Sequence, residues 1–481
     1  MNLIVLMIDT MRMDHIGFHN EGKPVFDGIP ACRTPNIDRF AAEAVVFDNM
    51  YPEALPTIPA RAGLMTGART LVNRPWAPLA DTDISISEIL GPNGYVCGIA
   101  SDTYHYRAPG MNYHRAFHSY EWVRGQEYDP WKSHPPDLDL DDYVNSHFDE
   151  VWRARAAQFL TNTRVFKSAD EWFAPQVADL TVQWLKDNRD HPNVFFWMDS
   201  FDPHEPWDPP AEFDVYNDPN YKGPRLVLPM GGMAADWASP EEVDFLRGMY
   251  AGEVASVDWA LERVFGALEE LGYYDDSMVV LMGDHGFPLG DHGKFLKGVD
   301  RLYGEIMNVP FMVRMPGGEH AGRRVSAIAQ FQDFLPTMLD LLGLGANNMD
   351  LPGESLRGLI EGETDEHRVS VICGYQDGLG RVIRSRDWSL ILRPAGEQSE
   401  LYDLHKDPGE TKNLIADNAE VVREMIEQFG SIYYGDLWPG QNVTAVPEFV
   451  RRAIGDHALQ NEGKNVLGLQ GKHEISSGMV D

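Results

Sequence analysis

Short apolar runs that end in polar residues constrain the fold of this chain more than any other feature of its sequence. Runs typical of buried strands cover residues 3–8, 45–49, 95–100, 194–198 and 278–282. Stretches with the apolar spacing of amphipathic helices lie between them, at residues 36–44, 60–66 and 242–271. This alternation predicts an α/β fold in which a parallel sheet is covered by helices.

Polar side chains follow several of these runs directly. Asp9 and Asp102 each come after a predicted strand, as do the segment from Asp199 to His204 and the pair Asp284 and His285. In open α/β sheets, ligands bind at the carboxyl ends of the strands. One edge of the sheet is therefore expected to carry the chemistry.

The pattern divides the chain into a large and a small part. Residues 1–365 form the predicted catalytic α/β domain, and within it residues 105–170 are aromatic-rich, lack periodicity and exceed an ordinary connection. We interpret this stretch as an insertion over the site, with residues 104–131 shaping the leaving-group pocket. Strands at 381–383 and 389–392 and a helix near 419–429 predict that residues 366–481 form a small C-terminal α+β subdomain with a tail.

Charge excludes several kinds of partner. With 74 acidic against 40 basic residues, the formal net charge is −34, which repels nucleic acid and anionic membranes, so neither is expected as a partner. An anionic substrate would need a local cluster of cations to reverse this field. Basic residues near the sequence motifs are therefore the candidates for binding an anionic substrate.

The cysteines and the apolar runs bear on the cellular location of the protein. Cys32, Cys97 and Cys373 are far apart and form neither a disulfide nor a zinc-binding pattern. The first apolar run is too short for a signal peptide, and no run approaches the roughly 20 residues that cross a bilayer. A cytoplasmic location is the resulting expectation.

Residues 56–67, with the sequence PTIPARAGLMTG, place a hydroxyl just before a predicted helix that starts near Pro59 and ends near Gly67. That hydroxyl belongs to Thr57, and a helix N-terminus stabilises negative charge beside it. Taken alone, Thr57 is better interpreted as a helix cap than as a reactive residue.

The same segment resembles the nucleophile motif of sulfatases and phosphonate monoester hydrolases: Cys or Ser, any residue, Pro, Ser or Ala, Arg, and later Thr-Gly. The resemblance continues at residues 9–12 (DTMR), 34–39 (TPNIDR), 202–204 (DPH), 283–286 (GDHG) and 401–414. Six matches in order over residues 1–415 identify the chain as a member of the sulfatase branch of the alkaline-phosphatase superfamily. The resemblance implies an alkaline-phosphatase-like α/β/α sandwich with a large mixed, mostly parallel sheet and a small C-terminal antiparallel sheet.

The resemblance also implies a metal site. Asp9, Asp284 and His285 fall on the family's ligand positions, joined by the oxygen of Thr57. Oxygen donors with one imidazole suit Mn, Zn, Ca or Mg, and such a cation lowers the pKa of a bound alcohol for attack at neutral pH. One divalent metal ion is the expected cofactor, because Asp199 and His204 have the wrong spacing for a second site.

Further residues acquire roles from the same resemblance. Arg61 matches the arginine that holds the nucleophile and a substrate oxygen, and Lys297 matches the lysine that touches the nucleophile and the leaving oxygen. His204 matches the histidine that protonates the leaving group, a task that needs a pKa near 7; a capped turn is its alternative. Asn73 and His105 are candidates for contacts with substrate oxygens.

Departures from the family pattern bear on the substrate. In sulfatases the Cys or Ser becomes formylglycine, whereas Thr57 would attack directly and form a covalent ester that water must break. Thr10 stands where many sulfatases have a second Asp ligand, and Asp102 falls close to the position of a sulfate-directed lysine. Threonine nucleophiles belong, within the superfamily, to nucleotide phosphodiesterases and phosphoethanolamine transferases. These departures favour phosphorus over sulfur.

The leading hypothesis is a hydrolase of a small anionic ester, a phosphodiester or phosphonate monoester, attacked by Thr57. One alternative is a sulfate-ester hydrolase that uses threonine directly. Another is a non-catalytic binding protein on a sulfatase scaffold, against which the retained charged residues argue. Relatives of this size often associate through C-terminal extensions, so a homo-oligomer is expected, although the tail fits a frayed terminus equally well.

Overall fold

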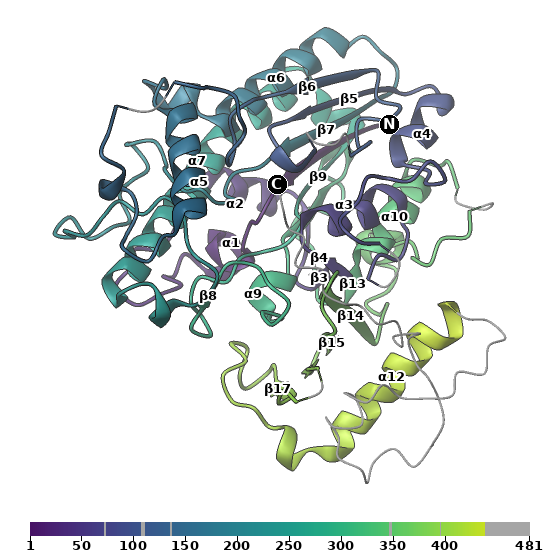
Figure 1. The fold of residues 1–481 in the computed structure, drawn as a ribbon. Coiled ribbons are helices and arrows are strands. Elements are labelled where there is room, and N and C mark those ends of the chain that lie inside the picture. Colours follow the sequence, from purple (N-terminus) through teal and green to yellow (C-terminus); the bar gives the residue numbers. More distant parts are fainter. Residues whose placement is uncertain (72–73, 107–110, 135–136, 346–348, 395, 438–481) are drawn as a thin grey trace.

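The computed structural model describes residues 1–437 apart from 72–73, 107–110, 135–136, 346–348 and 395. A sheet of eight strands lies at its centre with helices on both faces, and a five-stranded sheet lies beside it (Figure 1). This confirms the predicted α/β/α sandwich with a small C-terminal sheet. Asn73 and the tail beyond residue 437 lie outside the described residues.

The large sheet is mixed and mostly parallel. Its strand order is β12 (Arg324–Val325), β2 (Val45–Phe47), β11 (Phe311–Arg314), β9 (Ser277–Gly283), β1 (Asn2–Ile8), β7 (Val194–Ser200), β5 (Val96–Ser101) and β6 (Ser119–Trp122). From β9 to β6 the strands run parallel, whereas β11 is antiparallel to both of its neighbours. The carboxyl ends of the parallel strands therefore share one edge.

Helices cover both faces, which is why the central strand is an unbroken apolar run. Ile4, Leu6 and Ile8 of β1 pack in a core with α2 (Pro35–Ala42), α6 (Phe173–Asn188) and α7 (Pro240–Glu270). The alternate residues Leu3, Val5 and Met7 pack on the other face with α3 (Thr57–Thr66), α4 (Ile86–Leu90) and α10 (Phe334–Leu341).

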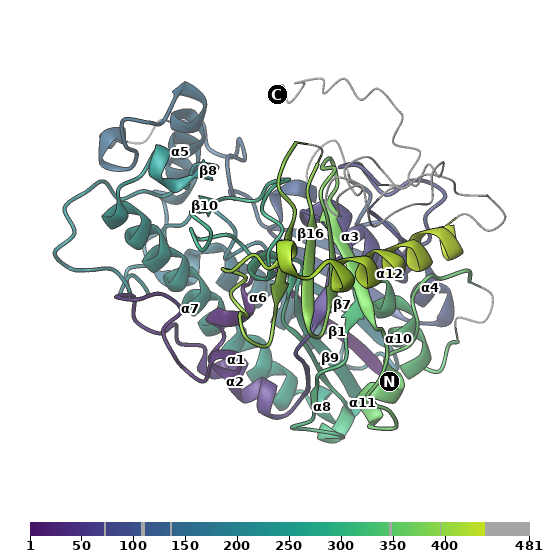
Figure 2. The same cartoon turned by 90° about the horizontal axis from the view of Figure 1, so that it is seen from below.

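The small sheet takes one strand from the N-terminal part of the chain. Its order is β17 (Glu400–Asp403), β16 (Trp388–Leu392), β15 (Arg381–Ser385), β14 (Ser370–Tyr375) and β4 (Ala54–Leu55), and β4 is parallel to β14. The helix α12 (Ala419–Leu437) lies across this sheet (Figure 2). Because β4 ends two residues before Thr57, the C-terminal sheet anchors the chain that enters α3.

Residues 105–170 are only in part the irregular insertion that the sequence predicted. They contain β6, the edge strand of the large sheet, and α5 (Glu150–Thr163), which is capped by the Asp149 carboxylate. The strand escaped prediction because its side chains are half-buried or exposed and therefore form no apolar run.

The remaining elements are short. They are α1 (Gly17–Asn20), α8 (Tyr273–Asp276), α9 (Gly304–Met307), α11 (Arg357–Glu361), the pair β3 (Met50–Tyr51) and β13 (Ala329–Gln330), and the pair β8 (Gly232–Met233) and β10 (Lys294–Phe295). The cysteines are buried and form no disulfide, as the sequence predicted. Within the described ranges, every helix is too short or too polar to cross a membrane.

Candidate active site and metal centre

The carboxyl ends of neighbouring parallel strands hold the candidate site. Asp9 follows β1, Asp102 follows β5, and Asp284 and His285 follow β9, while Asp199 is the penultimate residue of β7. All of these side chains are fully buried. Because β5, β7, β1 and β9 are adjacent, their ends bring these residues to one place, as the sequence predicted.

Thr57 is the first residue of α3 and lies at this edge. The N-cap position of this helix is occupied by Pro56, and the Oγ1 atom of Thr57 lies 3.1 Å from Nε2 of His285. The helix ends at Gly67, whose φ of 67° is the left-handed conformation typical of a helix C-terminus. The interpretation of Thr57 as a helix cap is therefore wrong, and its hydroxyl belongs to the site.

Asp9, Asp284 and His285 form a compact group in which one ligand atom of each lies within 4.8 Å of the others. Nδ1 of His285 donates a hydrogen bond to its neighbour's carbonyl oxygen at 2.9 Å, which leaves Nε2 as an electron-pair donor. Burial lowers the pKa of His285 to about 4, so the ring is neutral. This is the form in which imidazole binds metals.

Thr10 orients both carboxylates of this group. Its amide donates to Oδ1 of Asp284 at 3.1 Å, and its hydroxyl donates to Oδ1 of Asp9 at 2.6 Å. The φ of Thr10 is 60°, a conformation that is uncommon outside glycine and that clusters at functional sites. Thr10 thus contributes to the site by positioning the two carboxylates.

Arg61 joins the carboxylates that follow different strands. It is fully buried, and its Nε atom donates to Asp284 at 3.0 Å, Nη2 to Asp9 at 2.8 Å and Nη1 to Asp199 at 2.7 Å. A guanidinium with its fixed fork of donors suits this geometry. Arg61 therefore lies among the candidate metal ligands, where protein carboxylates engage most of its donors; its contacts with the nucleophile and a substrate oxygen stay predictions.

Asp199 is a functional residue to which the sequence assigned no role. Besides Arg61, it accepts hydrogen bonds from the hydroxyls of Thr103 and Tyr106 and from the indole N–H of Trp197. Every partner of this carboxylate is a donor, and these contacts fix the guanidinium of Arg61 in place. Its position at a strand end was the signal that could have identified it.

The buried charges at this edge do not balance without a cation. Asp9, Asp199 and Asp284 surround a single guanidinium, and burial together with the charge of Asp284 raises the pKa of Asp9 well above its usual range. A divalent cation would supply the missing positive charge. Carboxylate oxygens, the Thr57 oxygen and one neutral imidazole fit the predicted metal ion.

His204 and Lys297 lie together at the side of the site predicted for the leaving group. The Lys297 ammonium lies 2.9 Å from Nε2 of His204 and 2.9 Å from the Glu205 carboxylate. Nδ1 of His204 donates to the Glu205 carbonyl oxygen at 2.6 Å, so Nε2 accepts from the ammonium. Burial and the charge of Lys297 lower the pKa of His204 well below its usual value, away from the pKa near 7 predicted for an isolated acid.

His105, the candidate for a contact with substrate oxygens, adjoins this pair. Its ring lies edge-on to that of His204, with centroids 5.5 Å apart, and edge-on to Trp76 at 4.8 Å. Glu127 completes the group, yet the sequence placed it only within the aromatic segment. Burial and the charge of Glu205 raise the pKa of Glu127 to about 8. A single Glu in an aperiodic segment carries no motif that could have identified it.

Known proteins share this arrangement of fold and motifs. The family model of the sulfatases matches residues 1–344. The chain belongs to the sulfatase family. A second model, described as N-sulphoglucosamine sulphohydrolase, C-terminal, matches residues 290–432 and so covers the four C-terminal strands of the small sheet and most of α12.

Relatives in this family span nearly the whole chain. An arylsulfatase from Clostridium perfringens is 26% identical over 91% of this chain and 94% of its own length. An N-acetylglucosamine-6-O-sulfatase from Bacteroides thetaiotaomicron is 24% identical over 82% of this chain and 81% of its own length. The solved phosphonate monoester hydrolase of Agrobacterium radiobacter has a TM-score of 0.71 at 22% identity, covering 93% of this chain and 98% of that one.

These findings establish the class of enzyme. This sulfatase-family chain is a hydrolase of anionic esters in the alkaline-phosphatase superfamily, whose members bind a divalent metal. Among the described residues, the group of Asp9, Asp284 and His285 offers oxygen and imidazole donors that fit such an ion.

One departure from the sulfatase pattern has a structural explanation. Asp102 accepts from the amide of Phe201 at 2.6 Å and from Nε2 of Gln126 at 2.9 Å, and the same amide group donates to Asp202 at 2.6 Å. Burial raises the pKa of Asp102 well above its usual range and that of Asp202 to about 6. Asp102 holds neighbouring loops together and does not replace the sulfate-directed lysine of many sulfatases.

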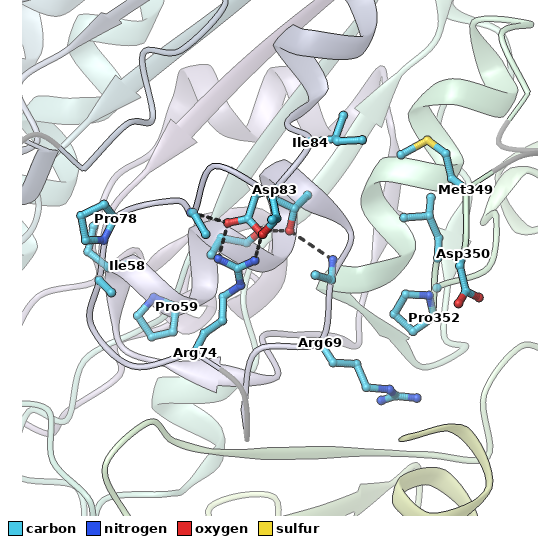
Figure 3. A pocket seen from close by; sticks show the side chains of 18 of the residues that line it. Ile58, Pro59, Arg69, Arg74, Pro78, Asp83, Ile84, Met349, Asp350 and Pro352 are labelled. Atoms are coloured by element: carbon cyan, nitrogen blue, oxygen red, sulfur yellow. Dashed lines mark hydrogen bonds and ion pairs between the residues drawn. The ribbon is translucent and has the colours of Figure 1, made fainter. Parts of the chain in front are cut away.

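A broad hollow lies on the other side of the helix that carries Thr57 (Figure 3). Ile58 and Pro59 of α3 line it, together with Pro352 and the ion pair of Arg74 with Asp83. The described residues of its lining include none of the sulfatase metal ligands, nor His204 or Lys297. The candidate active site is therefore the sheet edge and not this hollow.

Proposed function

We propose that this sulfatase-family enzyme hydrolyses phosphodiesters or phosphonate monoesters, and that Thr57 is the nucleophile. The observation that carries the proposal is the position of the Thr57 hydroxyl, which is buried and lies 3.1 Å from Nε2 of His285 within the metal-ligand group. A hydroxyl in that position becomes a nucleophile when a bound divalent cation lowers its pKa.

The side chain of threonine favours a phosphorus ester over a sulfate ester as the substrate. Formylglycine is an aldehyde, and its hydrate expels sulfate by collapsing back to the carbonyl. Thr57 carries a methyl group on Cβ, so its oxidation would yield a ketone, which cannot be formylglycine. Thr57 must therefore act as an alcohol, and the covalent ester that it forms must be broken by a second attack at the transferred group. Phosphoryl and phosphonyl transfer through such an intermediate is established nucleophilic catalysis.

Before the first step the Thr57 hydroxyl loses its proton to solvent, so that Thr57 attacks as an alkoxide and is released again as an alkoxide in the second step. In the first step the bond from Thr57 Oγ1 to phosphorus forms and the bond from phosphorus to the leaving oxygen breaks. The leaving alkoxide takes a proton from the pair of His204 and Lys297, in which the ammonium already donates to Nε2 at 2.9 Å. In the second step water attacks phosphorus and releases Thr57, and the same pair accepts the proton of the water.

A sulfate-ester hydrolase that uses Thr57 directly remains the second candidate. The relatives favour it, because the similar proteins include an arylsulfatase and an N-acetylglucosamine-6-O-sulfatase. Transfer of a sulfuryl group to Thr57 would follow the same geometry, with a sulfate ester of threonine as the intermediate.

The test compares initial rates on four nitrophenyl compounds: the phosphate, a phosphate diester, the phenylphosphonate and the sulfate. Metal-stripped protein is reloaded with Mn, Zn, Ca or Mg before each assay. We expect the diester or the phosphonate to react fastest, and rapid-quench mass spectrometry to detect the phosphorus group on the Thr57 peptide. Faster turnover of the sulfate would favour the second candidate instead.

Substitutions in α3 distinguish the loss of the nucleophile from a general folding defect. Thr57→Ala should lower kcat/KM by at least about 10³-fold, because no other group replaces the nucleophile, whereas Thr57→Ser should retain activity. Thr66→Ala is the matched control on the same helix, since the Thr66 hydroxyl bonds only locally, to Ala62 and Ala68. Unchanged turnover in Thr57→Ala would refute the proposed nucleophile.

A further inference from the structure

His105, Glu127 and His204 form a second compact group beside the family metal site. One ligand atom of each lies within 4.8 Å of the others, the same bound that holds for the group of Asp9, Asp284 and His285. The charges of Asp284 and His285 act on His105, which shows that the two groups are close neighbours. The second group, however, contains two imidazoles and one carboxylate.

Glu127 is not explained by the packing around it. Its Oε2 atom is buried and accepts no hydrogen bond from any described residue. A buried carboxyl oxygen without a partner costs free energy, so such an atom in a native protein needs an explanation, and a bound ion is one that satisfies it. The backbone of Glu127 has a φ of 49°, which is rare outside glycine and typical of side chains held in a functional position.

We propose that His105, Glu127 and His204 form a second divalent-metal site, selective for zinc-like ions and separate from the family site. Two neutral imidazoles and one carboxylate are a donor set that zinc favours, whereas Mg, Ca and Mn favour oxygen donors such as those around Asp9. In His204 the Nδ1 atom is committed to the Glu205 carbonyl, so Nε2 is the ligand. The second site therefore differs from the first in the ions that it selects.

Lys297 is the group that the ion must displace. Its ammonium lies 2.9 Å from Nε2 of His204, in the direction from which an ion would bind. The ammonium also pairs with the Glu205 carboxylate at 2.9 Å, so it keeps a partner after it leaves His204. Binding of zinc thus breaks one hydrogen bond of Lys297 and satisfies the free oxygen of Glu127.

Occupancy of this site has a consequence that rests on the proposed function. There, the pair of His204 and Lys297 supplies the proton to the leaving group. An ion on Nε2 of His204 removes this pathway, so excess zinc inhibits an enzyme whose first site is loaded with Mn. The second site is in this sense inhibitory.

The site itself is tested by counting bound zinc after equilibrium dialysis against zinc alone. Wild-type protein should hold two zinc ions per chain, Asp284→Asn and Glu127→Gln one each, and the double variant none. Glu121→Gln is the matched control, because Glu121 lies on β6 in the same segment and is exposed; it should hold two. His105→Gln should lose the same equivalent as Glu127→Gln, which guards against a folding defect in either variant.

The outcomes separate the site from the proposed function. One zinc ion in the wild type, or two in Glu127→Gln, would overturn the second site whatever Thr57 does. With Mn in the first site, excess zinc should lower the wild-type rate at least about 10-fold and leave the rate of Glu127→Gln unchanged by zinc. A second zinc ion that binds without inhibition would overturn the inhibitory role and the assignment of His204 to proton transfer, while the site would stand.

Discussion

Asp199→Asn tests whether a residue that touches neither metal nor substrate fixes the active-site arginine. Asn has the shape of Asp, but its NH₂ group must face a donor, because the partners of Asp199 include Nη1 of Arg61, the hydroxyl of Thr103 and the indole of Trp197. The substitution removes the carboxylate from the buried ion pair of Asp199 with Arg61, and it leaves the NH₂ group of Asn facing an N–H or O–H donor of the protein. We expect a loss of about 3–5 kcal/mol in the free energy of unfolding. A displaced guanidinium should also lower kcat/KM about 10²-fold.

The assay is denaturant unfolding, with the midpoint and the slope measured separately. Asp179→Asn is the control, because Asp179 also pairs with an arginine, Arg263, at 2.9 Å, but its side chain is 59% exposed. An exposed pair contributes at most about 1 kcal/mol, so this variant should be nearly as stable as the wild type. Equal stability losses in the two variants would refute the reasoning that burial makes the network around Arg61 important.

Three further predictions follow from the described residues. Burial alone would raise the pKa of Asp333, but hydrogen bonds from Arg368 and its neighbour prevail and lower it from 3.8 to about 2. A folded-state pKa below the unfolded one stabilises the protein at higher pH, so stability of about 2 kcal/mol should be lost as the pH falls from about 4 to about 2. Asp333→Asn should abolish this loss in unfolding titrations. Gly286→Ala should lower metal affinity in the family site at least about 10-fold, because the added Cβ would lie 1.9 Å from the carbonyl oxygen of Glu305. Gly266→Ala is the control, because the space around Gly266 is open, and it should leave the metal affinity unchanged. Equilibrium dialysis measures the metal affinity of both variants. Chelation should lower the unfolding midpoint and weaken binding of inorganic phosphate, measured by calorimetry, at least about 100-fold; unchanged phosphate binding would contradict the need for a cation.

The sequence predicted the strands whose residues are all buried, and it failed to predict strands that mix buried and exposed residues or are very short. The strands β1, β7 and β9 are buried on both faces, so each is a continuous apolar run that no helix period explains. In β6 the side chains are half-buried or exposed, and β4 has only two residues, so neither leaves a periodic signal. β4 forms by pairing with the distant strand β14, and β6 by pairing with β5 at the edge of the large sheet; local patterns encode neither pairing.

The site could be predicted where its residues follow a strand or lie on a motif. Asp9 and Asp284 do both, and Thr57 lies on a motif whose spacing reflects one turn of a helix. The role of Asp199 depends on donors from other strands and loops, and that of Glu127 on a loop with an unusual backbone angle. Such roles arise from tertiary contacts, so the residue types along the chain did not reveal them.

The hydrogen bonds of the site explain how a chain with a net charge of −34 attracts an anion. Arg61 has five N–H groups, and its contacts with Asp284, Asp199 and Asp9 engage every nitrogen, which leaves one N–H at most. Lys297 likewise spends two of its three donors on His204 and Glu205. Arg61 and Lys297 therefore serve mainly to hold carboxylates and His204 in place. It follows that most of the attraction for a phosphorus or sulfur oxyanion must come from the metal ion, and that the basic residues position the chemistry more than they bind the substrate.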